Sequence, residues 1–282
     1  MRTTNTMHEP ENPTLGRFFT FLRQREEQRR HDAGTLPRNR KLSREKAAGE
    51  AHITASYLTK LERDEVGRVD IGILRQLTDT YRANDEEWRY ACDLAGYASP
   101  YPVWPGLDPA SHMPSLEVFQ AALTPIMRTE MAEATGDLVS FYTPQRRLLA
   151  ANQAYYDTFP THEPGLYLLE WSFTDEAKEV MINWDDQADV GVAWHRGMIG
   201  RYGHTDWAQE QHRRLWEFPE FRKKWENVEV AYARALSAET LVRKPDGDYV
   251  MIMENWQLQH HLPITRSRGR LYPADRAAST AS

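Results

Sequence analysis

The residues from Leu42 to Arg63 carry side chains suited to contacting a nucleic acid. The pattern predicts two short helices joined by a tight turn at His52. In the second helix Leu58 and Leu61 would point inward, which leaves a small, polar and cationic face on the outside. The outward side chains are those of Ala55, Ser56, Thr59 and Lys60. A short helix carrying such a face is what helix-turn-helix proteins place in the major groove of duplex DNA.

Local signals around the turn support this interpretation. Ser43 and Thr54 precede the two helices, where a side-chain oxygen can cap the first free backbone N–H groups. The first helix has a small apolar face that lets its partner approach closely, made of Ala47, Ala48 and Ala51. His52 stands where a left-handed residue, commonly Gly, is expected, and His tolerates positive φ better than most residues.

A basic loop precedes the motif. Residues 36–41 contain a proline and three cations, Arg38, Arg40 and Lys41. These cations could simply face solvent. Beside a helix-turn-helix, however, we expect them to contact phosphates, which hold a protein on DNA without reading its sequence.

The charge distribution agrees with a local DNA-binding face. The whole chain has a formal net charge of −6, but residues 14–68 hold 13 Lys and Arg against 8 Asp and Glu. Residues 69–282 hold 21 against 31. The basic excess is therefore confined to the first segment, and the acidic remainder suggests a second role, such as contacting the transcription machinery.

Composition excludes several other classes. A single cysteine, Cys92, allows neither an internal disulfide nor a multi-thiolate metal site, and it fits a cytoplasmic protein. Cys92 is expected to be a small buried hydrophobe. No apolar run approaches the roughly 20 residues of a membrane span, so no membrane partner is expected. The first 13 residues lack the order of a signal peptide.

The order of helical, proline-rich and strand-like segments predicts two domains. Residues 14–97 are expected to form an all-α, five-helix domain, in which Ile71, Leu74, Leu77 and Tyr81 share one buried face. A proline-rich linker spans residues 98–114. Residues 115–272 are expected to form an α+β domain with a small mixed sheet covered by helices. Disordered ends are expected at residues 1–13 and 273–282.

The sequence predicts three features of the second domain. One helix is expected over about 115–133. Residues 137–143 and 146–152 look like strands, and residues 239–258 look like two strands joined at 245–247.

The motif resembles the Xre/Cro/434-repressor class of helix-turn-helix proteins. The matching residues are Leu42, Ser43, Glu45, Ala48, Ile53, Thr54, Tyr57, Leu58, Leu61 and Glu62. The resemblance implies that base edges are read by Arg44, Ala55, Ser56 and Lys60. It implies that Thr54 and Tyr57 contact the sugar-phosphate backbone of DNA. We expect the same kind of contact from Ser43, Arg38, Arg40 and Lys41. It also implies that Glu62 is a buried acid paired with Arg23 or Arg25. Departures are His52 for the turn Gly and Asp64 for the Gly that usually follows.

The chain from Leu15 to about Leu258 is similar to the MmyB-like regulators, which join an Xre-type domain to a PAS-like ligand-binding domain. The signature residues are Leu149, Ala150, Asn152, Leu168, Leu169, Trp171, Phe173, Thr174, Asp175, Trp184, Pro219, Glu220, Phe221, Arg222, Trp225 and Val228. The resemblance implies a transcription regulator that binds a pseudo-palindromic operator as a homodimer and senses a small, apolar, fatty-acid-like ligand.

The residues alone leave the ligand question open. A pocket could be lined by Phe141, Trp171, Phe173, Trp194 and Trp256, but large aromatic side chains also dominate ordinary cores. A ligand carboxylate could be anchored by Arg196, Arg201 or His195, although each could equally lie on a solvated helix face. The alternative is a second domain that only dimerises or binds a protein.

Neither a metal site nor a catalytic site is expected. Five histidines of the second domain could suggest a metal site, but none has the spacing that puts two imidazoles on one helix face; they are His195, His204, His212, His260 and His261. The sequence has no nucleophile elbow and no phosphate-cradling glycine loop. We therefore expect no cofactor other than the possible fatty-acid-like ligand.

Overall fold

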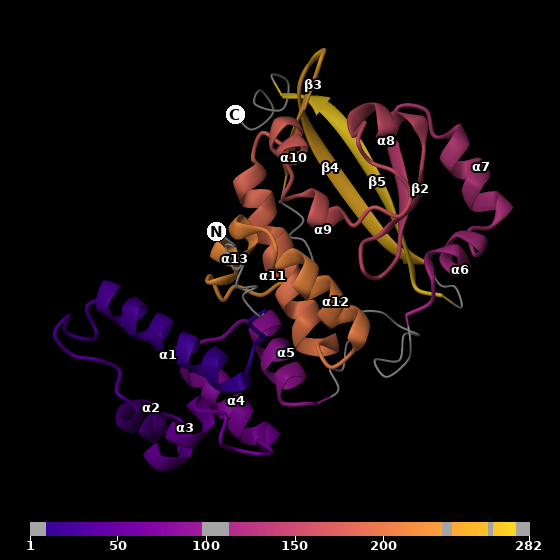
Figure 1. Cartoon of the computed structure of the whole chain (residues 1–282). Coiled ribbons are helices and arrows are strands. Elements are labelled where there is room, and N and C mark those ends of the chain that lie inside the picture. The colour runs from indigo at the N-terminus through magenta and orange to yellow at the C-terminus, as the bar shows by residue number, and fades with distance from the viewer. Residues whose placement is uncertain (1–9, 98–112, 233–238, 259–261, 275–282) are drawn as a thin grey trace, which may run out of the picture. The chain divides into compact units, whose positions relative to one another are not determined.

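A computed structural model describes residues 10–97, 113–232, 239–258 and 262–274 (Figure 1). The chain forms two compact units. The first contains residues 1–101, 192–213 and 225–233, and the second contains residues 102–191, 214–224 and 234–282. Most of the predicted N-terminal disorder, of the linker and of the C-terminal tail lies outside the described residues.

The five predicted N-terminal helices are confirmed. They are α1 (Leu15–Asp32), α2 (Arg44–Glu50), α3 (Ala55–Glu62), α4 (Ile71–Thr80) and α5 (Asp85–Leu94). Capping explains where the helices of the motif begin. The hydroxyls of Ser43 and Thr54 accept hydrogen bonds from the backbone N–H groups of Lys46 and Tyr57.

The core of this five-helix domain is apolar, with one correction to the predicted face of α4. Leu74, Leu77 and Tyr81 are at most 1% exposed, whereas Ile71 is 47% exposed. Ile71 is the first residue of α4, directly after the cap Asp70, so no preceding turn covers it. Cys92 is buried, as expected.

The predicted helix over residues 115–133 is wrong in one respect, because two helices occupy this range. They are α6 (Leu116–Ala121) and α7 (Pro125–Glu133). Pro125 has no N–H to continue α6, but it suits the first turn of a helix. The hydroxyl of Thr124 caps the new helix by accepting from the backbone N–H of Met127.

The second unit is built on one five-stranded sheet. Its strands are β1 (Leu138–Tyr142), β2 (Leu148–Ala151), β3 (Thr240–Lys244), β4 (Gly247–Leu258) and β5 (Ile264–Pro273). They lie in the order β2-β1-β5-β4-β3 (Figure 1). Strand β5 was not predicted, because arginines interrupt its apolar pattern. The predicted turn between β3 and β4 is confirmed by the pairing of Lys244 with Gly247.

The expected α+β class is confirmed, but the expected mixed sheet is wrong. Every pairing between the five named strands is antiparallel. The connections explain this, since β1–β2, β3–β4 and β4–β5 are joined by short links that reverse the chain, whereas a parallel pair needs a long crossover.

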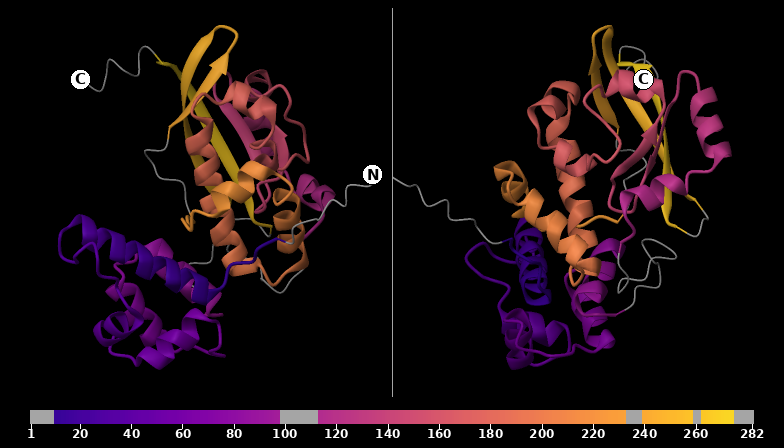
Figure 2. Two further views of the ribbon diagram at one scale, coloured as in Figure 1. Left: turned by 60° about the vertical axis from the view of Figure 1, so that its left-hand side comes forward. Right: turned by 45° about the vertical axis from the view of Figure 1, so that its right-hand side comes forward.

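Helices cover the two faces of the sheet. On one face Leu138, Tyr142 and Met251 pack with residues of α8 (Gln153–Thr158), α9 (Leu168–Trp171) and α10 (Asp175–Val180). On the other face Val139 and Phe141 pack against α6 and α7. Alternate residues of β1 therefore serve two separate cores, as the two-residue period of a strand requires. Figure 2 shows helices on both sides of the sheet.

Three further helices complete the described elements. They are α11 (Trp184–Tyr202), α12 (Asp206–Leu215) and α13 (Pro219–Trp225). The boundary between the two compact units falls inside α11, between Gly191 and Val192. Residues from α11 and α12 therefore belong to the same compact unit as the five N-terminal helices.

Candidate nucleic-acid interface and ligand-binding region

The turn of the helix-turn-helix has the geometry that its sequence predicts. His52 has a φ of 55°, in the left-handed region. Its N–H donates to Gly49 O at 3.2 Å, and the N–H of Ile53 donates to Ala48 O at 2.9 Å. These two bonds satisfy carbonyl groups at the end of α2. Asp64, the second departure from the usual glycines, also has positive φ, at 57°.

Asp64 has a further role that the sequence pattern did not reveal. Its carboxylate accepts a hydrogen bond from the hydroxyl of Thr14 at 2.6 Å and from the N–H of Gly16 at 2.7 Å. The residue after the recognition helix therefore caps the start of α1. A carboxylate beside these free N–H groups is favourable because the helix dipole is positive there.

The beginnings of α2 and α3 form a shallow concave face of about 520 Å³. Its lining is mostly polar or cationic and comprises Arg23, Lys41, Leu42, Ser43, Arg44, Glu45, Ala55, Ser56 and Thr59. Three predicted base-reading residues, Arg44, Ala55 and Ser56, therefore lie together with two predicted backbone contacts, Lys41 and Ser43.

The other predicted contacts are not among the residues that line this face. Lys60, Thr54, Arg38 and Arg40 are exposed, and Tyr57 is half-buried. Arg38 and Arg40 belong to the loop before α2, whereas Lys60 is on α3 itself. None of these cations is held in an ion pair within the described part of the chain, so the positive charge of the loop stays accessible.

A buried carboxylate fixes the concave face from behind. The side chain of Glu62 has no exposed area and accepts hydrogen bonds from Arg23 at 2.7 and 2.9 Å. The same guanidinium donates to Leu42 O at 3.1 Å, which ties α1 to the start of the motif. The predicted pairing of Glu62 is thus found with Arg23. The other candidate, Arg25, binds Glu87 on α5.

Glu62 also holds a predicted base-reading residue. The Nε of Arg44 donates to Glu62 Oε2 at 2.5 Å, while the side chain of Arg44 remains 43% exposed. This contact was not predicted, because it joins the start of α2 to the end of α3 across the turn. It restricts the orientations of Arg44 at the edge of the concave face.

Arg30 ties α1 to α2 from the other side. It donates to Glu50 at 2.7 and 2.9 Å and to Glu26 at 2.6 Å. The hydrogen bond and charge of Arg30 lower the pKa of the Glu50 carboxyl. Both helices of the DNA-binding motif are therefore anchored on α1 by charged side chains.

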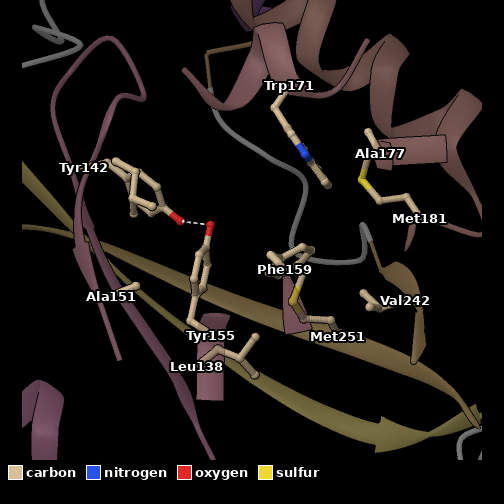
Figure 3. Close-up of a cluster of buried hydrophobic side chains, with 11 residues drawn as sticks. Leu138, Tyr142, Ala151, Tyr155, Phe159, Trp171, Ala177, Met181, Val242 and Met251 are labelled. Atoms are coloured by element: carbon tan, nitrogen blue, oxygen red, sulfur yellow. Dashed lines mark hydrogen bonds between the residues drawn. The ribbon is translucent and has the colours of Figure 1, made fainter. Parts of the chain in front are cut away.

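In the second unit two buried tyrosines share a hydrogen bond inside a cluster of hydrophobic side chains (Figure 3). The Tyr142 hydroxyl donates to the Tyr155 hydroxyl at 2.9 Å, and Tyr155 Oη lies 2.7 Å from Nδ1 of His162. Nε2 of His162 is buried without a hydrogen-bond partner. Burial lowers the pKa of His162 to about 3, so the imidazole is neutral at physiological pH.

The rings around His162 are closely packed. Phe159 stacks on His162 with centroids 4.9 Å apart, and Trp171 meets the same ring edge-on at 4.2 Å. The indole N–H of Trp171 donates to the Thr161 hydroxyl at 3.0 Å. The signature residue Trp171 therefore lies next to a buried polar atom that has no hydrogen-bond partner.

Another signature residue has a structural explanation. The side chain of Asn152 accepts from the backbone N–H groups of Val139 and Tyr155, each at 3.1 Å. Its amide nitrogen donates to Ala134 O at 2.9 Å and to Asp137 O at 2.8 Å. One buried amide thus joins the end of α7, the start of β1 and the start of α8, and each bond satisfies a buried backbone group.

The aromatic residues suggested as pocket lining do not form one group. Phe141 packs on the α6–α7 face, whereas Trp171 packs on the opposite face of the sheet. Phe173 packs against Phe221, and Trp256 is 41% exposed beneath the guanidinium of Arg266. The fifth, Trp194, is half-buried in the first unit. Side-chain position depends on strand register and face, which aromatic composition does not specify.

The three residues suggested as carboxylate anchors are buried in the first unit rather than on a solvated face. His195 and Arg196 are at most 3% exposed, and the Arg201 side chain is 12% exposed. His195 Nε2 lies 3.2 Å from His212 Nδ1. Among the described residues no group of three or more His, Cys, Asp or Glu could hold a metal ion. Two of the five histidines, His260 and His261, lie outside the described residues.

Comparison with protein families assigns both parts of the chain. Residues 14–90 match a helix-turn-helix domain, and residues 141–278 match the MmyB-like transcription regulator ligand binding domain. No curated protein matches the chain. Both families are those of transcription regulators rather than of enzymes. In the described part of the chain no helix is long and apolar enough to cross a membrane.

Proposed function

The chain belongs to the MmyB-like transcription regulators, and we propose that it binds a pseudo-palindromic operator as a homodimer whose second domain senses a small apolar ligand. Two copies of α3 would enter successive major grooves about one helical turn, roughly 34 Å, apart. The base contacts would come from Arg44, Ala55, Ser56 and Lys60.

The concave face at the starts of α2 and α3 carries this proposal. It gathers cationic and hydroxyl side chains, and Glu62 holds it rigidly against α1. Rigid placement matters because a helix reads bases only when its side chains meet the groove edges in a fixed register. The exposed Arg38, Arg40 and Lys41 would neutralise phosphates beside the groove.

The test is binding of the full chain to DNA from its own genomic neighbourhood at two salt concentrations. We expect one fragment to stay bound between about 50 mM and about 200 mM salt, while a random fragment of equal length is released. Light scattering of the complex should give two chains per operator. Equal release of both fragments, or one chain per operator, would contradict the proposal.

A ligand for the second domain is supported by its family and by the buried Nε2 of His162. A neutral imidazole without a partner can share a hydrogen bond with a ligand hydroxyl or carboxylic acid. We expect mass spectrometry of the full chain to detect a co-purified lipid, or fatty acids of graded length to raise the melting temperature. If neither result is obtained, the second domain has no such ligand, and the alternative below is supported.

That alternative, a second domain which only dimerises or binds a protein, is favoured by one observation. Ile252 and Trp256 are 45% and 41% exposed and lie four residues apart on β4, so they share one face of the sheet. Exposed large apolar side chains of this kind are common at protein interfaces. Trp256→Ser should then weaken association without changing any fatty-acid response.

A further inference from the structure

A small pocket lies within the first unit, away from the DNA-binding face. Its volume is about 160 Å³, and it is bordered by the segment before α1, by α1 itself, and by α5, α11 and residues 225–228. The lining residues are Glu11, Asn12, Pro13, Thr14, Arg17, Phe18, Tyr90, Arg196, Trp225, Glu226 and Val228. At roughly 30 Å³ per water molecule, this space suits a ligand of only a few non-hydrogen atoms.

The deepest cation of this pocket lacks an acidic partner among the described residues. Arg196 is 3% exposed, and its Nη2 donates to two carbonyl oxygens, those of Trp225 and Asn227. Its guanidinium lies 3.9 Å from the centroid of the Trp225 ring. Nε is buried without a hydrogen-bond partner. Burial lowers the pKa of Arg196, as expected for a charge that is incompletely compensated.

A second arginine on the same helix shows the contrast. Arg201, five residues along α11, lies 3.6 Å from the carboxylate of Asp93, whose side chain is 2% exposed. A buried guanidinium normally has such a carboxylate, because an unpaired buried charge is strongly unfavourable. Arg196 has no such carboxylate partner in the described part of the chain, and a pocket adjoins it.

Tyr90 supplies a second polar group beside this pocket. Its side chain is fully buried, and its hydroxyl lies beside the Arg196 guanidinium, a group that can only donate, so the hydroxyl proton has no acceptor. The absence of a side chain at Gly200 allows this position, since a Cβ there would overlap the Tyr90 ring. A buried hydroxyl that lacks an acceptor is uncommon in folded proteins and often marks the place of a bound group.

We propose that this pocket binds a small carboxylate of a few carbons, which accepts hydrogen bonds from Arg196 and Tyr90. The walls suit a short apolar chain, because Phe18, Trp225 and Val228 lie beside the two polar groups. This site is separate from the fatty-acid-like ligand proposed for the second unit, and its test requires no DNA.

The rim limits which anions fit. Glu11 forms an ion pair with Arg17, and Glu226 is exposed. The rim therefore carries more negative than positive charge, which disfavours multivalent anions such as phosphate. A monocarboxylate places its single charge at Arg196, and an amino acid could in addition place its ammonium near Glu226. Propionate and alanine distinguish these two forms.

The experiment is thermal unfolding of the full chain with sodium propionate, alanine, phosphate or chloride at one ionic strength. We expect propionate or alanine to raise the melting temperature with saturation, as binding to the native state requires. Phosphate and chloride should not. Equal shifts with all four solutes, or no saturable shift with propionate and alanine, would overturn the proposal.

Three variants assign the effect to the pocket. Arg196→Gln should weaken binding on the order of tenfold or more, and Tyr90→Phe should weaken it less, since the charged guanidinium binds a carboxylate more strongly than a neutral hydroxyl does. Arg213→Gln, on the exposed face of α12, is the matched control and should bind as the wild type does. If Arg196→Gln does not fold, Tyr90→Phe decides. An undiminished shift in either pocket variant that folds would overturn the site.

Discussion

The guanidinium of Arg23, on α1, donates two hydrogen bonds of 2.7 and 2.9 Å to the carboxylate of Glu62, the last residue of α3. The Glu62 side chain has no exposed area, and that of Arg23 is 12% exposed. This pair positions the recognition helix, because it joins the end of α3 to the helix that supports the motif. Its hydrogen bonding raises the pKa of Arg23 further.

We expect Glu62→Ala to lower the free energy of unfolding by about 3 kcal/mol, since it leaves the Arg23 charge buried and unpaired. Urea denaturation of the full chain, followed by circular dichroism, measures this. DNA affinity should fall as well, because Arg44 also loses its partner.

The matched control is Asp79→Ala, which removes an exposed ion pair with Arg75 on α4. Exposed pairs of this type contribute about 0–1 kcal/mol. If the two variants lose similar stability, Glu62 does not have the structural role assigned to it.

A second prediction concerns Gly16, in the first turn of α1. A Cβ at this position would lie 2.5 Å from Leu61 O and 2.8 Å from the carbonyl carbon of Glu62. Both are backbone atoms, which cannot move aside as a flexible side chain could. Gly16→Ala should therefore destabilise the protein by about 1–3 kcal/mol, although alanine favours helix.

Gly49 offers the opposite case in α2, since a Cβ there has no neighbour within 4 Å. Gly49→Ala should raise stability by about 0.5–1 kcal/mol. Paired melting curves of the two variants measure both effects. Equal signs for the two substitutions would show that α1 does not approach α3 as closely as the structure has it.

Much of the helix-turn-helix could be predicted because its signals are local. The caps Ser43 and Thr54, the left-handed His52 and the buried Leu58 and Leu61 follow from periodicity and hydrogen-bonding chemistry within a few residues. Arg23 and Arg25 were both predicted as possible partners of Glu62, without a choice between them. The choice of Arg23 depends on how α1 rotates about its axis, which no local pattern specifies.

The second unit was predicted less completely because its organisation depends on long-range pairing. The strand β5 pairs with both β1 and β4, yet its sequence places arginines at 266, 268 and 270. Two of these contact Asp137, which precedes β1, and the third contacts Glu130 on α7. These partners are more than 130 residues away, so no local pattern predicted this strand.

The ligand-pocket residues show the same limit. Phe141 and Trp171 were chosen as large aromatics, but the register of β1 assigns Phe141 to the face opposite Trp171. His162, by contrast, was not singled out. Its position seven residues after Tyr155, beyond α8, has no recognisable spacing, and the hydrogen bond to Tyr155 arises from the path of the loop.

The DNA contacts lead to a third prediction, on Lys60 and Arg40. Both side chains are exposed, but Lys60 is on α3 and Arg40 is in the loop before α2. Lys60→Ala should cost about 1–3 kcal/mol of operator binding and relax discrimination at one base pair per half-site. Arg40→Ala should weaken operator and random DNA alike and reduce the salt dependence by about one contact per subunit.

Lys60 is a cleaner test of base reading than Arg44, because Arg44→Ala also removes a contact with Glu62. Arg213→Ala on α12 controls for the loss of one positive charge. Fluorescence anisotropy with operator and random duplexes at several salt concentrations separates the two classes of contact. Identical behaviour of the Lys60 and Arg40 variants on both duplexes would contradict the assignment.

Buried histidines lead to a fourth prediction, on the dependence of stability on pH. Burial lowers the pKa of His162 to about 3 and that of His212 to about 4, and it lowers the pKa of His195 well below its usual value. The unfolded chain binds these protons near pH 6.5, whereas the folded chain does not. Stability is therefore full above about pH 6.5 and is lost as the pH falls toward about 4 and then about 3.

His162→Asn tests this dependence at one site. The variant retains a polar group near Nδ1 to meet the Tyr155 hydroxyl, but it cannot take up a proton. It should lose stability at pH 7.5, because Phe159 and Trp171 lose a packed ring. Between about pH 6.5 and 4 its stability should fall less steeply than that of the wild type, by about 1.4 kcal/mol per pH unit.

Urea denaturation at four pH values, with the exposed His204→Asn as the control for loss of an imidazole, measures the slopes. An unchanged slope in His162→Asn would show that His162 takes up its proton in the folded protein as readily as in the unfolded chain, and the proton linkage would then have to come from His195 and His212.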